Sequence, residues 1–286
     1  MKYFAPRTIE EAVGLLDADP SRKVFAGATD VIPQLRAGRP EPSGLVDLKK
    51  IERLVSVARS DTTWTIGAAA PTALLTGNAE LTSELPGLSE AAGLIGSDQV
   101  QNRSSLGGNL CNASPAADSV PAMVVNGARA VVVGPSGTRT VLVEHIPTGP
   151  GRTSLAHGEL VAEIQVDRPP PRTGDAYLRL IPRTEMDIAV VGAGARVTLD
   201  ADGRCTTAAI ALGAVAPTVV RVPAAESALV GRAIDDGVLA EVAAAASAAC
   251  NPIDDKRGTI AYRRHVAGVL AKRAVALAAQ RAGGAR

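Results

Sequence analysis

Apolar and polar positions along the first 50 residues predict a small α/β unit. A stripe of apolar residues at helical spacing follows Thr8 and Glu11, which form the pattern of a capping box, so we expect a short helix there. A strand over 23–26 is expected to lead through a small-residue loop into a helix over 31–37, which Gly38 ends. Residues 45–48, 54–57 and 63–66 have the composition of strands.

Further along, the pattern predicts two more units, over residues 51–172 and 173–286. The second has helical segments at 72–75 and 88–95, a long Gly/Ser/Asn loop over 96–112, a hairpin of strands 130–133 and 140–143, and a strand at 160–166. A stiff Pro-rich stretch over 168–172 marks the boundary. The third unit has strands at 177–181, 190–199 and 205–212, then helices at 224–230, 238–250 and 259–280.

Composition narrows the function classes. Apolar residues make up 46% and charged residues 21% of the 286 residues, values typical of a globular protein. The net charge is +1 and aromatic residues are only 2%, so we expect no nucleic-acid partner. We find no signal-peptide pattern and no apolar run long enough for a membrane span, and therefore expect a cytoplasmic protein.

The cysteines and histidines do not form a metal-binding pattern. Cys111, Cys205 and Cys250 are far apart and no C-x-x-C occurs, so we expect neither a zinc site nor an iron–sulfur cluster in this chain. Cys111 lies next to a glycine-rich loop. A small buried thiol is the simpler interpretation of this residue, and a redox role is the alternative.

One glycine motif is misleading. The segment Ile188–Val197 contains Gly-Ala-Gly after a strand, as in a dinucleotide-binding fingerprint. The third glycine position holds Val197, however, and the following residues predict a strand and a turn rather than a helix. We therefore interpret Gly192 and Gly194 as small residues in a packed strand.

Two other loops are better candidates for binding phosphate. One is Ala26–Asp30, between a strand and a helix, and the other is Ser104–Asn109. Both contain small residues whose backbone amides can approach a phosphate oxygen closely. Neither has the lysine of a P-loop, which argues against triphosphate hydrolysis.

The second loop and the residues after it carry a family resemblance. Ser105–Leu110 followed by Ala113–Asp118 resembles the FAD-binding medium subunits of molybdenum hydroxylases, the group of xanthine dehydrogenase and aerobic carbon monoxide dehydrogenase. Ala26–Asp30 is similar to the first flavin loop of that family, with Ala28 where glycine is more usual, and Arg183–Ala189 to its Arg-x-x-x-Asp-Ile-Ala segment. The resemblance extends over the whole chain.

The resemblance implies a fold and a set of cofactor contacts. The fold class is α+β: a vanillyl-alcohol-oxidase-type (PCMH-type) FAD-binding fold of two α/β subdomains, residues 1–50 and 51–172, plus a C-terminal α+β domain over 173–286. By resemblance the cofactor-binding residues are Val24, Phe25, Ala26, Gly27, Ala28, Thr29, Asp30, Val31, Ile95, Ser104, Ser105, Leu106, Gly107, Gly108, Asn109, Asp118, Val197 and Thr198. No histidine lies in either loop, so we expect non-covalent FAD.

The resemblance also implies a function in electron transfer. The chain is expected to be a flavin subunit that accepts electrons from the [2Fe–2S] clusters of a small subunit. A large subunit would hold the molybdenum cofactor, in a heterotrimer or its dimer. Because the flavin does the chemistry, we name no catalytic residue and no metal ligand in this chain.

Two alternatives stay open. One is a self-sufficient flavin oxidoreductase of the same fold, and the other is a non-catalytic assembly subunit with a structural nucleotide. The substrate of the complex (carbon monoxide, a purine, an aldehyde or an N-heterocycle) and the final acceptor (NAD, a quinone or dioxygen) are open as well.

Overall fold

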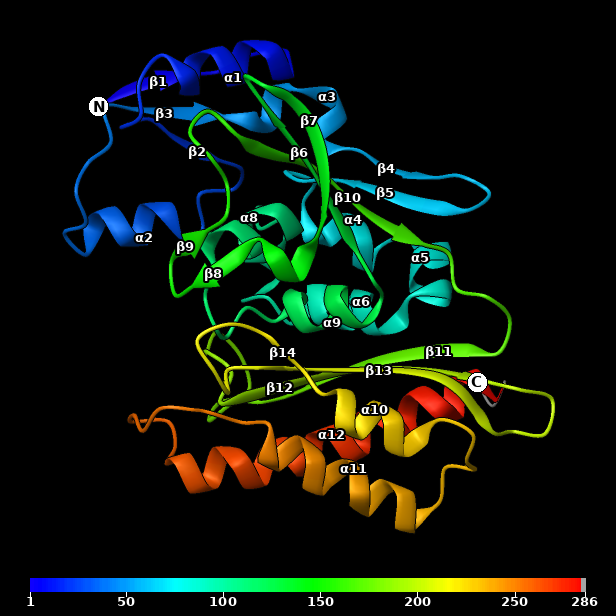
Figure 1. Ribbon diagram of the computed structural model, residues 1–286. Coiled ribbons are helices and arrows are strands. Elements are labelled where there is room, and N and C mark those ends of the chain that lie inside the picture. The colour runs from blue at the N-terminus through cyan, green and yellow to red at the C-terminus, as the bar shows by residue number, and fades with distance from the viewer. Residues whose placement is uncertain (284–286) are drawn as a thin grey trace.

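The structure, a computed structural model, describes residues 1–283 and begins with a small parallel sheet in the order β1-β3-β2 (Figure 1). The elements of this part are β1 (Lys2–Phe4), α1 (Ile9–Asp17), β2 (Lys23–Phe25), α2 (Val31–Arg36), β3 (Gly44–Asp47), a 3-10 turn (Leu48–Lys50) and α3 (Glu52–Val55). The Thr8 hydroxyl accepts the Glu11 amide at 3.1 Å, as the capping box predicts. The Glu11 carboxylate accepts the amide of Arg7 at 2.7 Å, one residue before the cap.

The second sheet is antiparallel, in the order β4-β5-β10-β6-β7. Its strands are β4 (Val57–Arg59), β5 (Thr63–Gly67), β6 (Arg129–Gly134), β7 (Gly137–Leu142) and β10 (Leu160–Asp167). A 3-10 turn (Val143–His145) and a two-stranded ribbon of β8 (Pro147–Gly149) and β9 (Arg152–Thr153) follow β7. Leu160 and Ala162 of β10 pack with α1 and β3, so the first two sheets share an apolar core.

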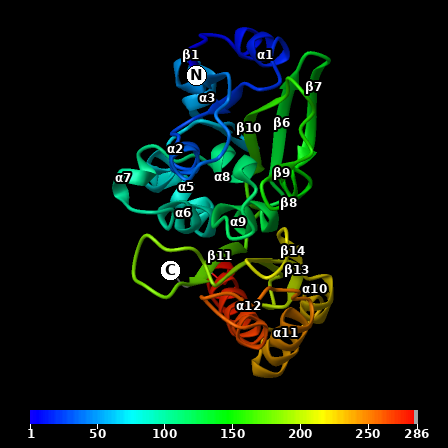
Figure 2. The same cartoon turned by 90° about the vertical axis from the view of Figure 1, so that its left-hand side faces the viewer.

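Six short helices lie between β5 and β6 in the sequence. They are α4 (Thr72–Thr76), α5 (Ala79–Glu84), α6 (Pro86–Gly93), α7 (Asp98–Gln101), α8 (Leu106–Asn112) and α9 (Ser119–Val125). Every residue of α9 is buried, and α6 and α9 lie between the second sheet and the C-terminal part of the chain (Figures 1 and 2). Buried on all sides, α9 links the two parts.

The C-terminal part is an antiparallel sheet in the order β11-β12-β13-β14, backed by three helices. The elements are β11 (Thr173–Leu180), β12 (Val191–Leu199), β13 (Cys205–Gly213), β14 (Val220–Arg221), α10 (Pro223–Leu229), α11 (Asp236–Ala248) and α12 (Ile260–Ala282). Side chains of a strand alternate between faces, and the odd-numbered residues of β12 pack in the core beneath the helices. No helix among residues 1–283 is long and apolar enough to cross a membrane.

Buried polar contacts join this sheet to the helices above it. Asp175 of β11, only 3% exposed, accepts the amides of Gly87 and Leu88 at 3.0 and 3.2 Å and the Asn126 side-chain amide at 2.7 Å. Burial raises the pKa of Asp175, and these donors oppose that effect. Because a buried carboxylate is costly unless it is paired, these bonds fix how the C-terminal sheet sits on α6 and α9.

Two sequence predictions are wrong in detail. Residues 54–57 are not one strand: α3 ends at Val55 and β4 begins at Val57, because Leu54 turns into the core while the Arg53 side chain pairs with Glu163 of β10. The segment 96–112 is not a continuous loop, since it contains α7 and α8. Because glycine and asparagine favour loops, the sequence did not predict the helix α8, which Ser105 caps.

Candidate functional site: two glycine loops in contact

The first loop, Ala26–Asp30, connects β2 to α2 at the edge of the small sheet. Ala28 has a φ of 60°, in the small left-handed region that an alanine tolerates at a cost of roughly 1 kcal/mol. The helix that follows buries no residue, and the side chain of Asp30 makes no capping bond. The loop and α2 therefore stand partly open, with amides and a carboxylate available to a ligand.

The second loop, Ser104–Asn109, forms the start of α8. Ser105 is the N-cap and its hydroxyl accepts the Gly108 amide at 3.1 Å. Ser104 is anchored to Thr72, hydroxyl to hydroxyl at 2.8 Å. The two glycines differ in their surroundings: a Cβ on buried Gly107 would lie 2.5 Å from the Ala68 carbonyl oxygen, whereas Gly108 is exposed and its Cβ would meet only the Ser105 hydroxyl, at 3.0 Å.

The two loops touch each other although they are far apart in the sequence. A Cβ on Gly27 would lie 1.8 Å from the carbonyl oxygen of Arg103, so the backbones of the two segments are in direct contact. The side-chain amide of Gln34, on α2, donates to Asn112 Oδ1 at the end of α8, at 2.8 Å. The fold thus brings the two predicted phosphate-binding loops together into one cradle.

Asp118 lies where this cradle meets the C-terminal sheet. Its carboxylate accepts the Tyr177 hydroxyl at 2.8 Å and pairs with Arg179 at 2.6 Å, and both partners come from β11. Burial raises the pKa of Asp118, while Arg179 and Tyr177 stabilise the charged form. The next residue, Ser119, donates its hydroxyl to Asn109 Oδ1 at 2.6 Å, which connects this cluster to the second loop.

The other sequence-predicted contacts are spread more widely. Ile95 follows α6 and is half-buried. Val197 is fully buried in the core between β12 and the helices α10, α11 and α12, so its side chain points away from α9. Thr198 hydrogen-bonds Thr173 at 2.9 Å on the neighbouring strand. A contact of Val197 or Thr198 with the cofactor stays a prediction.

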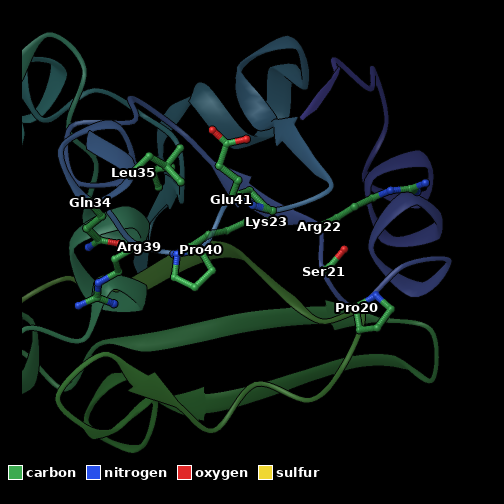
Figure 3. A pocket seen from close by; sticks show the side chains of 11 residues that line it. Pro20, Ser21, Arg22, Lys23, Gln34, Leu35, Arg39, Pro40 and Glu41 are labelled. Atoms are coloured by element: carbon green, nitrogen blue, oxygen red, sulfur yellow. The ribbon is translucent and has the colours of Figure 1, made fainter. Parts of the chain in front are cut away.

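Two cavities of about 390 Å³ each lie next to segments that continue from the loops, namely α2 and the residues after α8. The first lies beside α2 and is lined by Lys23, Val31, Gln34 and Leu35 together with Pro20–Arg22 and Arg39–Pro42 (Figure 3). The second lies at the junction with the C-terminal part, where Ser114–Ala116 face Ile188, Ala189 and the segment after α11. Neither cavity is lined by a residue of Ala26–Asp30 or Ser104–Asn109.

Comparison with known proteins agrees with this geometry. Residues 1–169 match the model of the FAD binding domain in molybdopterin dehydrogenase, and residues 176–278 match the CO dehydrogenase flavoprotein C-terminal domain. The chain belongs to the FAD-binding medium subunits of the molybdenum hydroxylases. FAD is the cofactor of this family, and its members are subunits of multi-subunit molybdenum dehydrogenases.

Individual relatives cover nearly the whole chain. The carbon monoxide dehydrogenase medium chain of Afipia carboxidovorans is 35% identical over 98% of this chain and 97% of its own length. The xanthine dehydrogenase FAD-binding subunit of Escherichia coli O157:H7 is 30% identical over 99% and 97%. Carbon monoxide dehydrogenase from Hydrogenophaga pseudoflava superposes with a TM-score of 0.94 at 34% identity, over 98% of both chains. The predicted fold class is confirmed.

The residues of the cradle fit FAD. Exposed Gly108 leaves the start of α8 open to close backbone approach, and a helix start favours an anion such as a diphosphate. The amides of the two loops supply donors without a basic residue in either glycine turn, as the sequence predicts. Cys111 lies beside them and is half-buried rather than fully buried, and desolvation raises the pKa of its thiol to about 12, which argues against a reactive thiolate.

Lys49 is a residue of the site that the sequence analysis missed. Its ammonium donates to the carbonyl oxygen of Ala26, in the first loop, at 2.7 Å and to Asp47 Oδ1 at 2.6 Å. It also lies 4.3 Å from the centre of the Phe25 ring, and Tyr3 donates to the other Asp47 oxygen at 2.7 Å. Lys49 therefore holds in place the carbonyl group of Ala26, the first residue of the first loop.

We predict that Lys49→Met weakens FAD binding several-fold. Methionine keeps the apolar part of the side chain but removes the charge-assisted bond to Ala26, worth roughly 1.5–3 kcal/mol. The measurement is titration of the apoprotein with FAD, followed by flavin fluorescence. Lys50→Met, at the exposed neighbouring position, is the matched control. Equal FAD affinities for the two variants would show that Lys49 does not order the loop.

Proposed function

We propose that this chain is the electron-transfer subunit of a molybdenum hydroxylase. It accepts electrons from the [2Fe–2S] clusters of a small partner subunit and delivers them to an external acceptor, while a large subunit holds the molybdenum cofactor. The observation that carries the proposal is the contact between the two glycine loops, in a chain that spans nearly the full length of medium chains. The heterotrimeric assembly and the cytoplasmic location are part of the same proposal.

The residues of the chain serve the cofactor by holding it. Bound FAD supplies the redox chemistry, since its ring takes up and releases two electrons. The loops Ala26–Asp30 and Ser104–Asn109 bind its diphosphate through backbone amides, and Lys49 keeps the first loop in place. Tyr177 and Arg179 of β11 donate hydrogen bonds to Asp118 and so attach the C-terminal sheet to the FAD-binding part of the chain.

The experiment that tests the proposal is stopped-flow reduction of the flavin in the purified chain, with and without the proposed small and large partner subunits. Reduction by substrate only when the partners are present supports electron transfer. A flavin that the partners never reduce argues for the structural-nucleotide alternative.

We also predict that the FAD is non-covalent. Neither loop contains a histidine, and Cys111, the cysteine nearest to them in sequence, has a thiol whose pKa burial raises to about 12. The purified chain should be yellow, and acid precipitation should release all of the flavin into the supernatant. Flavin absorbance that remains in the washed pellet would contradict the prediction.

A further inference from the structure

Arg179 is a buried arginine with unused hydrogen-bond donors. Its side chain is 5% exposed and faces α9 from β11. Nη1 donates to Asp118 Oδ2 at 2.6 Å, but neither Nε nor Nη2 donates to any atom of residues 1–283. A guanidinium has five N–H donors, and buried donors are rarely left without an acceptor. Arg179 therefore keeps donors that residues 1–283 do not use.

The open donor is Nη2. Nε is fully enclosed by protein, so no ligand atom reaches it, whereas Nη2 is not enclosed. Within residues 1–283, Arg263 is the other arginine whose Nε is enclosed and has no hydrogen-bond partner. Both terminal nitrogens of Arg263 are used, however, by the Val190 carbonyl at 2.5 Å and by Asp255 at 2.6 Å. Arg263 thus uses both terminal nitrogens to hold neighbouring protein groups, whereas Arg179 uses only Nη1 and leaves Nη2 without a partner in the described part of the chain.

The surroundings of Arg179 connect it to the cofactor cradle. Its partner Asp118 precedes Ser119, whose amide and hydroxyl both donate to Asn109 of the second glycine loop, at 3.3 and 2.6 Å. The residues just before Asp118, Ser114–Ala116, line the cavity of about 390 Å³ at this junction. Arg179 is therefore connected to the second glycine loop through Asp118 and Ser119.

We propose that Arg179 contacts the bound FAD, with Nη2 donating a hydrogen bond to one of its oxygens. The inference rests on the assignment of FAD to this chain and adds a contact from the C-terminal sheet. Asp118 and Tyr177 act as positioning residues, because they hold the guanidinium by its other edge: both Asp118 oxygens are already occupied, by Tyr177 and by Arg179. A charge-assisted bond of this kind is short and roughly twice as strong as a neutral one.

The test compares FAD affinity and thermal stability in a set of variants. Arg179→Gln should raise the Kd for FAD at least tenfold, the equivalent of about 1.4 kcal/mol, and Arg179→Lys should recover part of the loss. Arg196→Gln is the matched control, since Arg196 lies on the adjacent strand, is half-buried and donates to the Asn126 carbonyl at 3.3 Å. That variant should lose stability but keep its FAD affinity.

Removing the partner charge of Asp118 as well separates a loss of FAD binding from a loss of stability in Arg179→Gln. The single change leaves Asp118 buried without its cation, which is itself costly. Asp118→Asn can still bond to both neighbours, because the Tyr177 hydroxyl also serves as an acceptor, so this single variant is the reference against which the double variant is compared. The double variant Asp118→Asn/Arg179→Gln should regain stability and still bind FAD weakly. Recovery of wild-type FAD affinity in the double variant would overturn the proposal.

The midpoint potential of the flavin locates the acceptor. Uptake of two electrons and one proton leaves one negative charge on the isoalloxazine ring. If Nη2 faces the ring, Arg179→Gln therefore lowers the potential, and Arg196→Gln does not. If Nη2 faces the ribityl or diphosphate oxygens, only the Kd changes. Unchanged Kd and potential in Arg179→Gln would exclude the contact, whereas a wild-type chain that never binds FAD would instead refute the cofactor assignment.

Discussion

Gly108→Val should weaken FAD binding roughly a hundredfold or more, the equivalent of about 2.7 kcal/mol, while the apoprotein stays folded. Gly108 is exposed at the start of α8, and the nearest atom to a Cβ there is the Ser105 hydroxyl at 3.0 Å. A branched side chain is therefore accommodated by the apoprotein, but it occupies the space through which a diphosphate approaches the loop.

Gly194, which lies outside both loops, is the control for this experiment, and Gly107 is the glycine of the second loop that packs inside the protein. A Cβ on Gly194 would lie 2.9 Å from the Pro121 carbonyl oxygen on α9, and one on Gly107 would lie 2.5 Å from the Ala68 Cβ. Gly194→Val and Gly107→Val should therefore lower the melting temperature of the apoprotein. FAD titration and thermal unfolding of the three variants separate the two kinds of glycine. If Gly194→Val, once folded, lost FAD as completely as Gly108→Val, the assignment of the binding glycines would be wrong.

The same comparison explains why the misleading motif could be rejected from the sequence. Gly192 and Gly194 lie in β12 on the face of the sheet away from its helices. A Cβ on Gly192 would meet the Tyr177 hydroxyl, and one on Gly194 would meet the Pro121 backbone of α9. They are small because another element packs on them. Strand periodicity after Val197 was enough to predict this, since a dinucleotide-binding glycine motif must open a helix.

The second loop shows where sequence patterns fail. Residues 104–112 contain two glycines and two asparagines, which have low helix propensity, and the helix α8 forms because Ser105 caps it and Leu106 and Leu110 are fully buried. Tertiary burial overrides propensity here. The sequence predicted the loop residues that form the cradle, but not that most of them lie on a helix.

The residues around the loops were harder to predict than the loops themselves. Lys49 follows a strand, and nothing in its neighbourhood indicates that it reaches Ala26 across the parallel sheet. Arg179 did leave a signal: Asp175, Tyr177 and Arg179 alternate with Ala176 and Leu178 along β11, which is typical of a strand with one polar face. A polar face on a strand beneath buried helices requires partners, and in the structure these are Asn126 and Asp118.

Substrate should reduce the flavin of this chain only in the presence of its partner subunits, and this is the largest effect we expect. The three free cysteines are dispersed, with Cys205 and Cys250 buried in the C-terminal core, and among residues 1–283 no group of three or more His, Cys, Asp or Glu side chains is placed to hold a metal. The relatives that match this chain end to end are medium chains and subunits of larger dehydrogenases. We therefore expect the molybdenum chemistry and the cluster relay to be supplied by other chains.

The decisive measurement is stopped-flow absorbance after rapid mixing with substrate, using the complex co-purified through a tag on this chain. Cluster absorbance should change first and flavin absorbance should follow, because the clusters lie between the molybdenum site and FAD in the proposed sequence. The isolated yellow chain is the control. It should stay oxidised with substrate but bleach fully with dithionite, which shows that its flavin is competent. Bleaching of the isolated chain by substrate alone would instead establish a self-sufficient flavin oxidoreductase and remove the need for partners.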